Sequence, residues 1–267
     1  MPDNVIIAYK NIGETPLECL ERHRKERSID KDIPMTYAGR LDPMAEGLMI
    51  LLVGEECKNK DKYLGLDKTY EFKILVGFST DTYDLLGLVT QSEDKISVPG
   101  EHTREPEILS SGLAQELQKI LNQFIGTFTQ KYPSFSSKTI LGKQLWELSK
   151  DDELPENLPE HEVTIYKLSF NSSKIIQIGG LKKEIVSRIS LVNGDFRQEK
   201  IIEKWNQVFK DINQDRFEIL SFECECSSGT YIRQLVSDIS SKLGIPLVTY
   251  YINRTRIGEY TIDSVTK

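Results

Sequence analysis

The chain has 267 residues, enough for one large domain or two small ones with a substantial hydrophobic core. Its 34 Lys and Arg residues against 41 Asp and Glu residues give a formal net charge of −7, which argues against a protein whose whole surface binds a polyanion. The longest apolar run, residues 48–53, is too short to cross a membrane, and the N-terminus has no secretory pattern, so we expect a cytoplasmic protein.

The first part of the chain combines strand and helix patterns. Residues 5–9 predict a strand, and residues 15–27 predict a helix with a proline in its first turn. Residues 47–53 are continuously apolar, which fits either a buried helix or a buried strand. Residues 69–76 place apolar side chains at every second position and predict a strand, for which residues 88–90 are the expected hairpin partner. A strand followed by a helix therefore opens the predicted fold.

The second part mixes the same patterns without regular alternation. Residues 92–106 are polar and rich in turn-forming residues, so they predict a surface loop, whereas residues 108–126 predict a helix. Residues 217–226 alternate as a strand does, and residues 230–243 carry aliphatic side chains at helical spacing. Strands and helices that do not follow a regular β-α-β order indicate an α+β architecture.

Charge and pattern single out further segments. Residues 127–146 contain three lysines and no acid, whereas residues 147–162 are strongly acidic. Residues 167–215 include an amphipathic helical pattern at 199–209 and are interpreted as an inserted subdomain or decoration. Residues 226–258 carry a local excess of positive charge, so a basic face is compatible with the acidic total.

The densest chemical signal is the segment 38–47, AGRLDPMAEG, in which an aspartate directly precedes a proline. Gly39 and Gly47 permit tight backbone geometry, and Pro43 restricts Asp42 to extended conformations. The carboxylate of Asp42 can therefore be held out of a helix at the edge of a cleft. Taken alone, the segment is more simply interpreted as a turn that contains an aspartate.

Other segments supply side chains that suit the same kind of site. The sequence KTYEF places Tyr70 on a predicted strand, and SGTYIR supplies Tyr231 and Arg233. An aromatic ring can stack on a nucleobase, a carboxylate can react, and a guanidinium can hold that carboxylate ionised and oriented. Taken alone, Tyr70 would be a packed strand residue and Arg233 a solvated helix residue.

Together with further segments, these residues resemble the successive motifs of the TruB family of tRNA pseudouridine synthases. The resemblance holds in sequence, order and spacing, and it covers nearly the whole chain except residues 167–215. The resembling segments are residues 9–15 (YKNIGET), 38–47, 68–70, 79–84 (STDTYD), 132–138 (YPSFSSK), 228–233 and 253–260 (NRTRIGEY).

The resemblance implies an α+β pseudouridine synthase fold, in which a mixed, largely antiparallel sheet is flanked by helices and carries a central catalytic cleft. It implies a single catalytic domain over residues 1–267, with an RNA-gripping loop near residues 124–152 and an insertion near residues 167–215. Many relatives continue into a C-terminal RNA-binding PUA domain. No segment of this chain is long enough for one, so no PUA domain is expected.

The resemblance implies that the protein isomerises uridine to pseudouridine in RNA, with the T-loop uridine at position 55 of tRNA as the expected target. The N1 glycosidic bond breaks, the base turns, and C5 bonds to C1′ of the same ribose, so no redox change occurs and no cofactor is expected. The cysteines and histidines also lack metal-ligand spacing. The expected partner is the T stem-loop of tRNA, with no membrane and no required protein partner, and the enzyme is expected to be a monomer.

The roles of individual residues carry over from the matching motifs. Asp42 corresponds to the catalytic carboxylate, which either attacks C1′ or removes a proton from C2′; Tyr70 would stack on the flipped uracil, and Arg233 would pair with Asp42. Tyr37 stands where bacterial members usually have a histidine that helps to engage or flip the base. The expected substrate contacts are Tyr37, Arg40, Leu41, Lys68, Lys138, Tyr231 and Ile252.

Alternatives stay open beside this hypothesis. The chain could be a synthase for another RNA, although a guide-dependent enzyme would rely on protein partners and usually on the missing C-terminal domain. It could be a tRNA-folding chaperone without catalytic activity, which the presence of Asp42, Tyr70 and Arg233 disfavours. It could be a glycoside hydrolase with paired carboxylates, which is disfavoured because Asp42 has no second acid in a matching motif.

Overall fold

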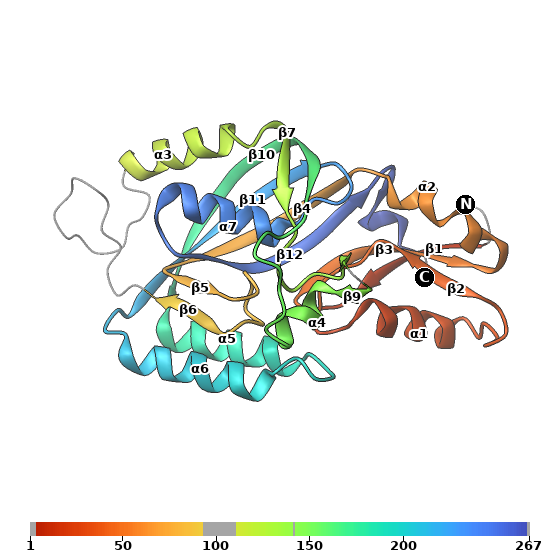
Figure 1. Cartoon of the computed structure of the whole chain (residues 1–267), viewed down its shortest axis with the longest axis horizontal. Coiled ribbons are helices and arrows are strands. Elements are labelled where there is room, and N and C mark those ends of the chain that lie inside the picture. The colour runs from red at the N-terminus through yellow and green to blue at the C-terminus, as the bar shows by residue number, and fades with distance from the viewer. Residues whose placement is uncertain (1–3, 93–110, 141, 266–267) are drawn as a thin grey trace.

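One large sheet forms the centre of the molecule (Figure 1). The computed structural model describes residues 4–92, 111–140 and 142–265, and within these the sheet has nine strands. Neighbouring strands are antiparallel, except that β3 (Ala45–Val53) and β12 (Leu247–Ile257) are parallel. The full order is β1 (Val5–Lys10), β3, β12, β4 (Lys68–Val76), β11 (Arg216–Cys226), β10 (Glu160–Gln177) and β7 (Gly126–Lys131), with β2 (Met35–Ala38) paired to β3 and β13 (Tyr260–Thr261) paired to β12.

Shorter elements surround this sheet. Small hairpins join β5 (Phe78–Thr80) to β6 (Val89–Ser92) and β8 (Thr139–Ile140) to β9 (Lys143–Gln144). Among the described residues, no helix combines the length and the apolar character needed to cross a bilayer. The helices are α1 (Pro16–Glu26), α2 (Lys60–Leu64), α3 (Ser111–Asn122), α4 (Leu145–Lys150), α5 (Ile178–Ser190), α6 (Gln198–Asp211) and α7 (Ile232–Leu243), with 3-10 turns at Gly54–Asn59 and Ile262–Ser264.

Strand β3 accounts for the apolar run that fitted either a helix or a strand. Leu48, Ile50 and Leu52 pack in one hydrophobic cluster, whereas Met49 and Leu51 pack in another. Side chains that alternate between two faces have the geometry of a strand. Because both faces are covered along residues 48–52, every position there is apolar, and the period of two disappears from the sequence.

The helices divide between the two faces of the sheet (Figure 1). On one face, Leu121 of α3 and Leu235 of α7 pack in the cluster that contains Phe72 of β4. On the other face, α5 and α6 lie side by side, and Trp205 of α6 packs in the cluster that contains Leu75 of β4. Neighbouring residues of β4 therefore serve separate cores, as the predicted alternation of residues 69–76 requires.

The expected hairpin between residues 69–76 and 88–90 is wrong. β4 lies between β12 and β11, and Gly77, with a φ of 93°, ends the strand and turns the chain away from the sheet. β6 pairs instead with β5. Both edges of β4 are occupied by strands from much later in the chain, which the local pattern cannot reveal. The surface loop predicted at residues 92–106 lies almost entirely outside the described residues.

The structure divides the segment 167–215, which was interpreted as one insertion. Its first part completes β10, which pairs with β11 from Lys167 opposite Glu225 to Gln177 opposite Arg216. Its second part is the helical pair α5 and α6, which connects β10 to β11. The predicted amphipathic helix at 199–209 is confirmed as α6.

Candidate active site

The loop between β2 and β3 presents Asp42. Gly47, which follows the loop, has a φ of 116°, and a Cβ atom on it would stand 2.4 Å from the carbonyl oxygen of Arg254. Only glycine fits where β3 and β12 approach so closely. Gly13 donates a backbone hydrogen bond of 2.8 Å to the carbonyl of Pro43, which fixes the middle of the loop. Asp42 is thus held outside regular structure, with its side chain 37% exposed.

Arg233 forms a bidentate ion pair with Asp42. Its Nε donates to Oδ2 over 2.7 Å, and its Nη2 donates to Oδ1 over 3.1 Å. A pair of this geometry keeps a carboxylate both ionised and oriented. Arg233 lies in the first turn of α7, where the helix dipole disfavours a cation. Its charge therefore serves its carboxylate partners rather than the helix.

Two loops fix the guanidinium of Arg233 from behind. Nη1 donates to the carbonyl of Thr82 over 2.8 Å, and Nη2 donates to the carbonyl of Phe135 over 3.1 Å. The residue is only 3% exposed. The direction in which Arg233 faces Asp42 is therefore set by the turn that carries Thr82 and by the segment that carries Phe135.

Asp84 is a second carboxylate beside Arg233. Its Oδ2 lies 3.7 Å from Arg233 Nε, and its Oδ1 accepts hydrogen bonds from the Thr82 hydroxyl over 2.7 Å and from Leu86 N over 3.0 Å. Burial raises the pKa of Asp84 to about 6, although Arg233 opposes this effect, and the charge of Asp42 adds to it. The sequence placed Asp84 in a resembling motif without indicating that it is buried against the pair of Asp42 and Arg233.

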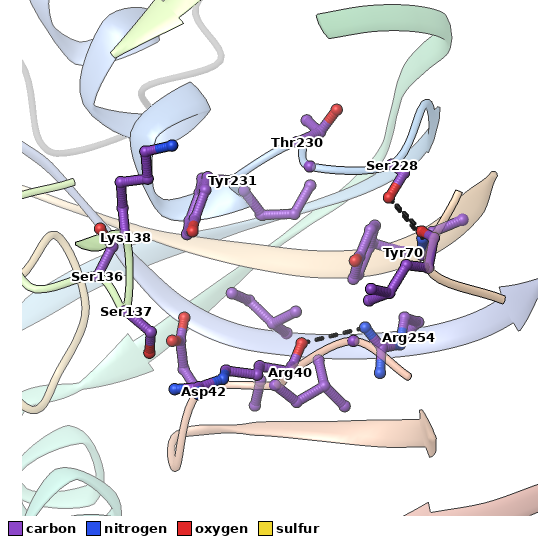
Figure 2. Close-up of a pocket in the computed structure, with 18 of the residues that line it drawn as sticks. Arg40, Asp42, Tyr70, Ser136, Ser137, Lys138, Ser228, Thr230, Tyr231 and Arg254 are labelled. Atoms are coloured by element: carbon purple, nitrogen blue, oxygen red, sulfur yellow. Dashed lines mark hydrogen bonds between the residues drawn. The ribbon is translucent and has the colours of Figure 1, made fainter. Parts of the chain in front are cut away.

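A cavity of about 420 Å³ opens beside Asp42. This volume is within the range of pockets that hold small organic ligands. Figure 2 shows Ser136, Ser137 and Lys138 on one side of the cavity and Tyr70, Ser228 and Arg254 on the other.

All but one of the residues that the sequence predicted for the site line this cavity. Arg233 does not line it but lies behind Asp42, to which it is paired. The other predicted residues all line it, namely Tyr37, Arg40, Leu41, Asp42, Lys68, Tyr70, Lys138, Tyr231 and Ile252.

Tyr70 and Tyr231 supply aromatic walls. Tyr70 lies on β4 and is 8% exposed, and burial raises the pKa of its hydroxyl. Burial, together with the charge of Asp42, raises the pKa of Tyr231 to about 12. Both phenols are therefore neutral at physiological pH. Neutral rings that face a cavity can stack on a planar base.

Lys68 holds one wall together. It is buried at the start of β4, and its Nζ donates to the carbonyl of Leu64 over 2.7 Å and to the hydroxyl of Ser228 over 3.0 Å. Ser228 donates in turn to the same carbonyl. Burial, with a smaller effect of the Arg254 charge, lowers the pKa of Lys68 to about 8. The ammonium thus ties β4 to the loop that leads to Tyr231.

Sequence reasoning missed Gln130 and Arg254 as parts of the site. Gln130 is fully buried on β7 and clamps Tyr231, accepting from its N–H over 2.9 Å and donating to its carbonyl over 3.2 Å. Arg254 donates to the carbonyls of Leu48 and Arg40 over 2.8 Å and 3.2 Å and so fixes the Asp42 loop. Arg254 lies within a resembling segment, which could have signalled it, but nothing local marks Gln130.

The rim of the cavity is basic. Lys138 is exposed, and its Nζ stands 5.1 Å from the ring centroid of Tyr132. Lys60, at the start of α2, also lines the cavity, with its Nζ 5.8 Å from the ring centroid of Tyr37. Cations at the mouth of a cavity suit a substrate with a phosphate backbone. In the part of the chain that the structure describes, no three His, Cys, Asp or Glu side chains converge as metal ligands would.

Comparison with known proteins decides the family. The model described as TruB family pseudouridylate synthase (N terminal domain) matches residues 27–179. The chain belongs to the TruB family. Over 98% of its length it is 32% identical to tRNA pseudouridine synthase B of Limosilactobacillus reuteri, of which it covers 69%. It is 28% identical, again over 98% of its length, to tRNA pseudouridine synthase B of Aquifex aeolicus, of which it covers 70%.

Solved structures share the fold of this TruB-family chain. A chain in the crystal structure of a Cbf5-Nop10-Gar1 complex matches with a TM-score of 0.55 and 15% identity, over 97% of this chain and 50% of that one. A chain in the structure of an H/ACA RNP bound to a substrate RNA containing 2′-deoxyuridine matches with a TM-score of 0.53 and 15% identity, over 97% of this chain and 49% of that one. This chain spans about half the length of those two chains. The expected α+β fold, with a mixed, largely antiparallel sheet flanked by helices, is confirmed.

Proposed function

We propose that this chain isomerises uridine to pseudouridine in the T loop of tRNA, at position 55, with Asp42 as the catalytic carboxylate. The observation that carries the proposal is the bidentate pair between Asp42 and Arg233, set at a cavity that Tyr70 and Tyr231 also line. Membership of the TruB family and the names of the relatives support tRNA as the substrate. The proposed setting is the cytoplasm.

In this reaction Asp42 acts on the ribose of the bound uridine. Its carboxylate either attacks C1′ or takes a proton from C2′ while the bond from N1 to C1′ breaks and its electrons leave with the uracil. The uracil turns and C5 bonds to C1′. In the first route this breaks the bond between Asp42 and C1′, and in the second route C2′ takes its proton back from Asp42. The C5 proton then leaves and N1 gains a proton, so the product is an isomer of the substrate and Asp42 is restored. Arg233 pairs with the carboxylate and keeps it oriented until it acts.

The walls of the cavity bind the extruded base. We assign Tyr70 to stacking on the uracil near C5, and Tyr231, Leu41 and Ile252 to the sides of the pocket. Extrusion of a base costs a few kcal/mol of lost stacking and pairing, and stacking on an aromatic ring recovers part of that cost. A rigid, neutral Tyr70 is suited to that task.

We assign residues 124–152 to gripping the RNA. Lys131 and Lys138 are exposed in this segment. Lys143, in contrast, is paired with Glu153 over 2.7 Å, and Lys150 is paired with Asp195 over 3.2 Å, so both charges are already compensated. Lys131 and Lys138 are therefore the cations of this segment that we expect to meet phosphates.

The test is pseudouridine mapping on an unmodified tRNA transcript with the wild-type protein, with Asp42→Asn and with Asp32→Asn as a matched control on an exposed carboxylate. We expect product at the T-loop uridine with the wild type and the control, and none with Asp42→Asn. Product from Asp42→Asn would contradict the role of Asp42, and product only at another position would contradict the target. Salt-sensitive binding without product from any of the three proteins would favour an RNA chaperone.

A further inference from the structure

Arg197, in the connection between α5 and α6, lies behind the loops that hold Arg233. Its Nη1 is 2.9 Å from Oδ2 of Asp81, and its guanidinium carbon is 4.6 Å from the ring centroid of Phe135. Asp81 belongs to the turn after β5, whereas Phe135 belongs to the segment between β7 and β8. One side chain thus joins two parts of the chain that have no link in sequence.

These are the same parts of the chain that orient the catalytic pair. Thr82, whose carbonyl accepts from Arg233, is the neighbour of Asp81 in the chain, and Phe135 itself provides the other acceptor. The guanidinium of Arg197 holds the outer side of both loops, and that of Arg233 holds the inner side. A continuous set of contacts therefore runs from Arg197 through both loops to Arg233 and Asp42.

Further contacts bind the helical pair to the same region. Trp205 is fully buried in α6, and its Nε1 donates to the carbonyl of Leu85 over 3.3 Å, next to Asp84. Nζ of Lys150, in α4, lies 3.2 Å from Oδ2 of Asp195, in the connection between α5 and α6. Figure 1 shows α5 and α6 below the hairpin of β5 and β6, close to α4. The contacts of Arg197 belong to a wider interface.

The backbone at Arg197 indicates that its side chain matters at this position. Its φ is 63°, in the left-handed region that favours glycine and asparagine over other residues. A long, charged side chain is kept there at a cost in backbone strain. The ion pair and the ring contact are the interactions that this side chain gains in return.

We propose that the α5–α6 pair is a buttress for the active site and that Arg197 is a positioning residue for the pair of Asp42 and Arg233. The proposal rests on the proposed function of Asp42. Arg197 touches no reacting atom, because it lies outside the cavity lining and acts through the two loops. The helical pair thus contributes to catalysis, and not only to the hydrophobic core.

The deciding variant is Arg197→Asn, because asparagine suits the left-handed backbone and is too short to maintain both contacts. We expect its melting temperature to be unchanged or higher. We expect its single-turnover rate constant at saturating enzyme to fall by about tenfold or more, because small displacements of reacting groups slow the chemical step. We expect the Kd for tRNA to change by less than about twofold. Arg197→Lys, which retains a charge for Asp81, should recover part of the rate. Lys200→Asn, at an exposed position of α6, should match the wild type in all three measurements.

Amide hydrogen exchange separates this inference from the proposed function. We expect Arg197→Asn to exchange faster than the wild type in residues 79–86 and 132–138, with α1 unchanged. An inactive wild type would refute the proposed function. Faster exchange in these loops would still support the inference that Arg197 and the α5–α6 pair hold them in place. A single-turnover rate equal to that of the wild type, or a loss that only follows the folded fraction, would overturn the role of Arg197.

Discussion

Arg233→Met removes the cation on which the buried charges of the site depend. Methionine keeps much of the apolar stem while it deletes every donor of the guanidinium. Asp42, at 37% side-chain exposure, can turn toward water, but Asp84, at 6%, is left as a buried carboxylate without its counter-charge. The main energetic consequence therefore concerns Asp84 rather than the catalytic aspartate.

The size of the effect follows from the burial of Asp84. Removing one partner of a buried ion pair typically costs about 3–5 kcal/mol of stability. Even with Arg233 present, burial raises the pKa of Asp84 from 3.8 to about 6. That shift means that the ionised carboxylate disfavours folding by about 3 kcal/mol above the raised pKa. Without Arg233 the pKa rises further, because the largest opposing influence is lost.

The sign of the pH dependence follows from this raised pKa. Above its ordinary pKa, Asp84 is ionised in the unfolded chain. On folding it must then either be buried as a charge or take up a proton, and either event lowers the free energy of unfolding. The extra penalty in Arg233→Met is complete above the new pKa and shrinks as the pH falls. We expect the free energy of unfolding to lie about 3–5 kcal/mol below that of the wild type at pH 8, with a smaller deficit at pH 5.

Urea unfolding at pH 5, 6.5 and 8 measures the deficit, and the double variant Arg233→Met with Asp84→Asn supplies the control. The double variant removes the uncompensated carboxylate, so we expect it to be more stable than Arg233→Met at pH 8 and to lose the extra pH dependence. It should remain inactive in pseudouridine mapping, because Asp42 still lacks its partner. A deficit that does not change with pH, or a double variant no more stable than the single one, would refute this reasoning.

Two further changes test the loop and the rim of the site. Gly47→Ala should lower the free energy of unfolding in urea by about 3 kcal/mol, because its Cβ would meet the Arg254 carbonyl at a positive φ. Gly54→Ala is the control: it also has a positive φ but no described atom within 4 Å, and it should lower the free energy of unfolding by about 1 kcal/mol. Equal losses would contradict the steric argument. Lys138→Gln should reduce the slope of log Kd for tRNA against log salt concentration by about 0.7–0.9, whereas Lys200→Gln should leave it unchanged. An unaltered slope in Lys138→Gln would mean that this lysine meets no phosphate.

The pair of Asp42 and Arg233 was predicted because both residues lie in segments that resemble successive motifs of the TruB family. Asp42 precedes Pro43 in a glycine-bounded loop, and Arg233 follows an SGTY sequence, but each segment taken alone favours a simpler interpretation. Their geometry could not be predicted, because the two residues are 191 positions apart and meet only through the order of the strands. The motifs identify such residues, whereas the long-range pairing of strands brings them together.

Gln130 and Asp84 show where local pattern gives no information. A polar residue on a strand or turn usually faces solvent, and only the complete fold buries these two against Tyr231 and Arg233. The same limit explains why the sequence did not predict the full length of β10. Most residues of its second half, 171–177, are exposed and lack an apolar alternation, so the pattern did not separate them from the helical pair that follows.

The position of β12 constrains how the protein can be synthesised and folded. β12 is the last long strand of the described chain, yet it lies between β3 and β4, which come from the first third of the chain. Until residues 247–257 leave the ribosome, one edge of β4 and residues 45–47 of β3 lack their partner strand, and unpaired edges favour wrong association. Sheets closed by strands distant in sequence also fold slowly. A nascent chain therefore carries Asp42 and Arg233 for a time without a framework to bring them together, and the two can pair stably only after β12 has been made.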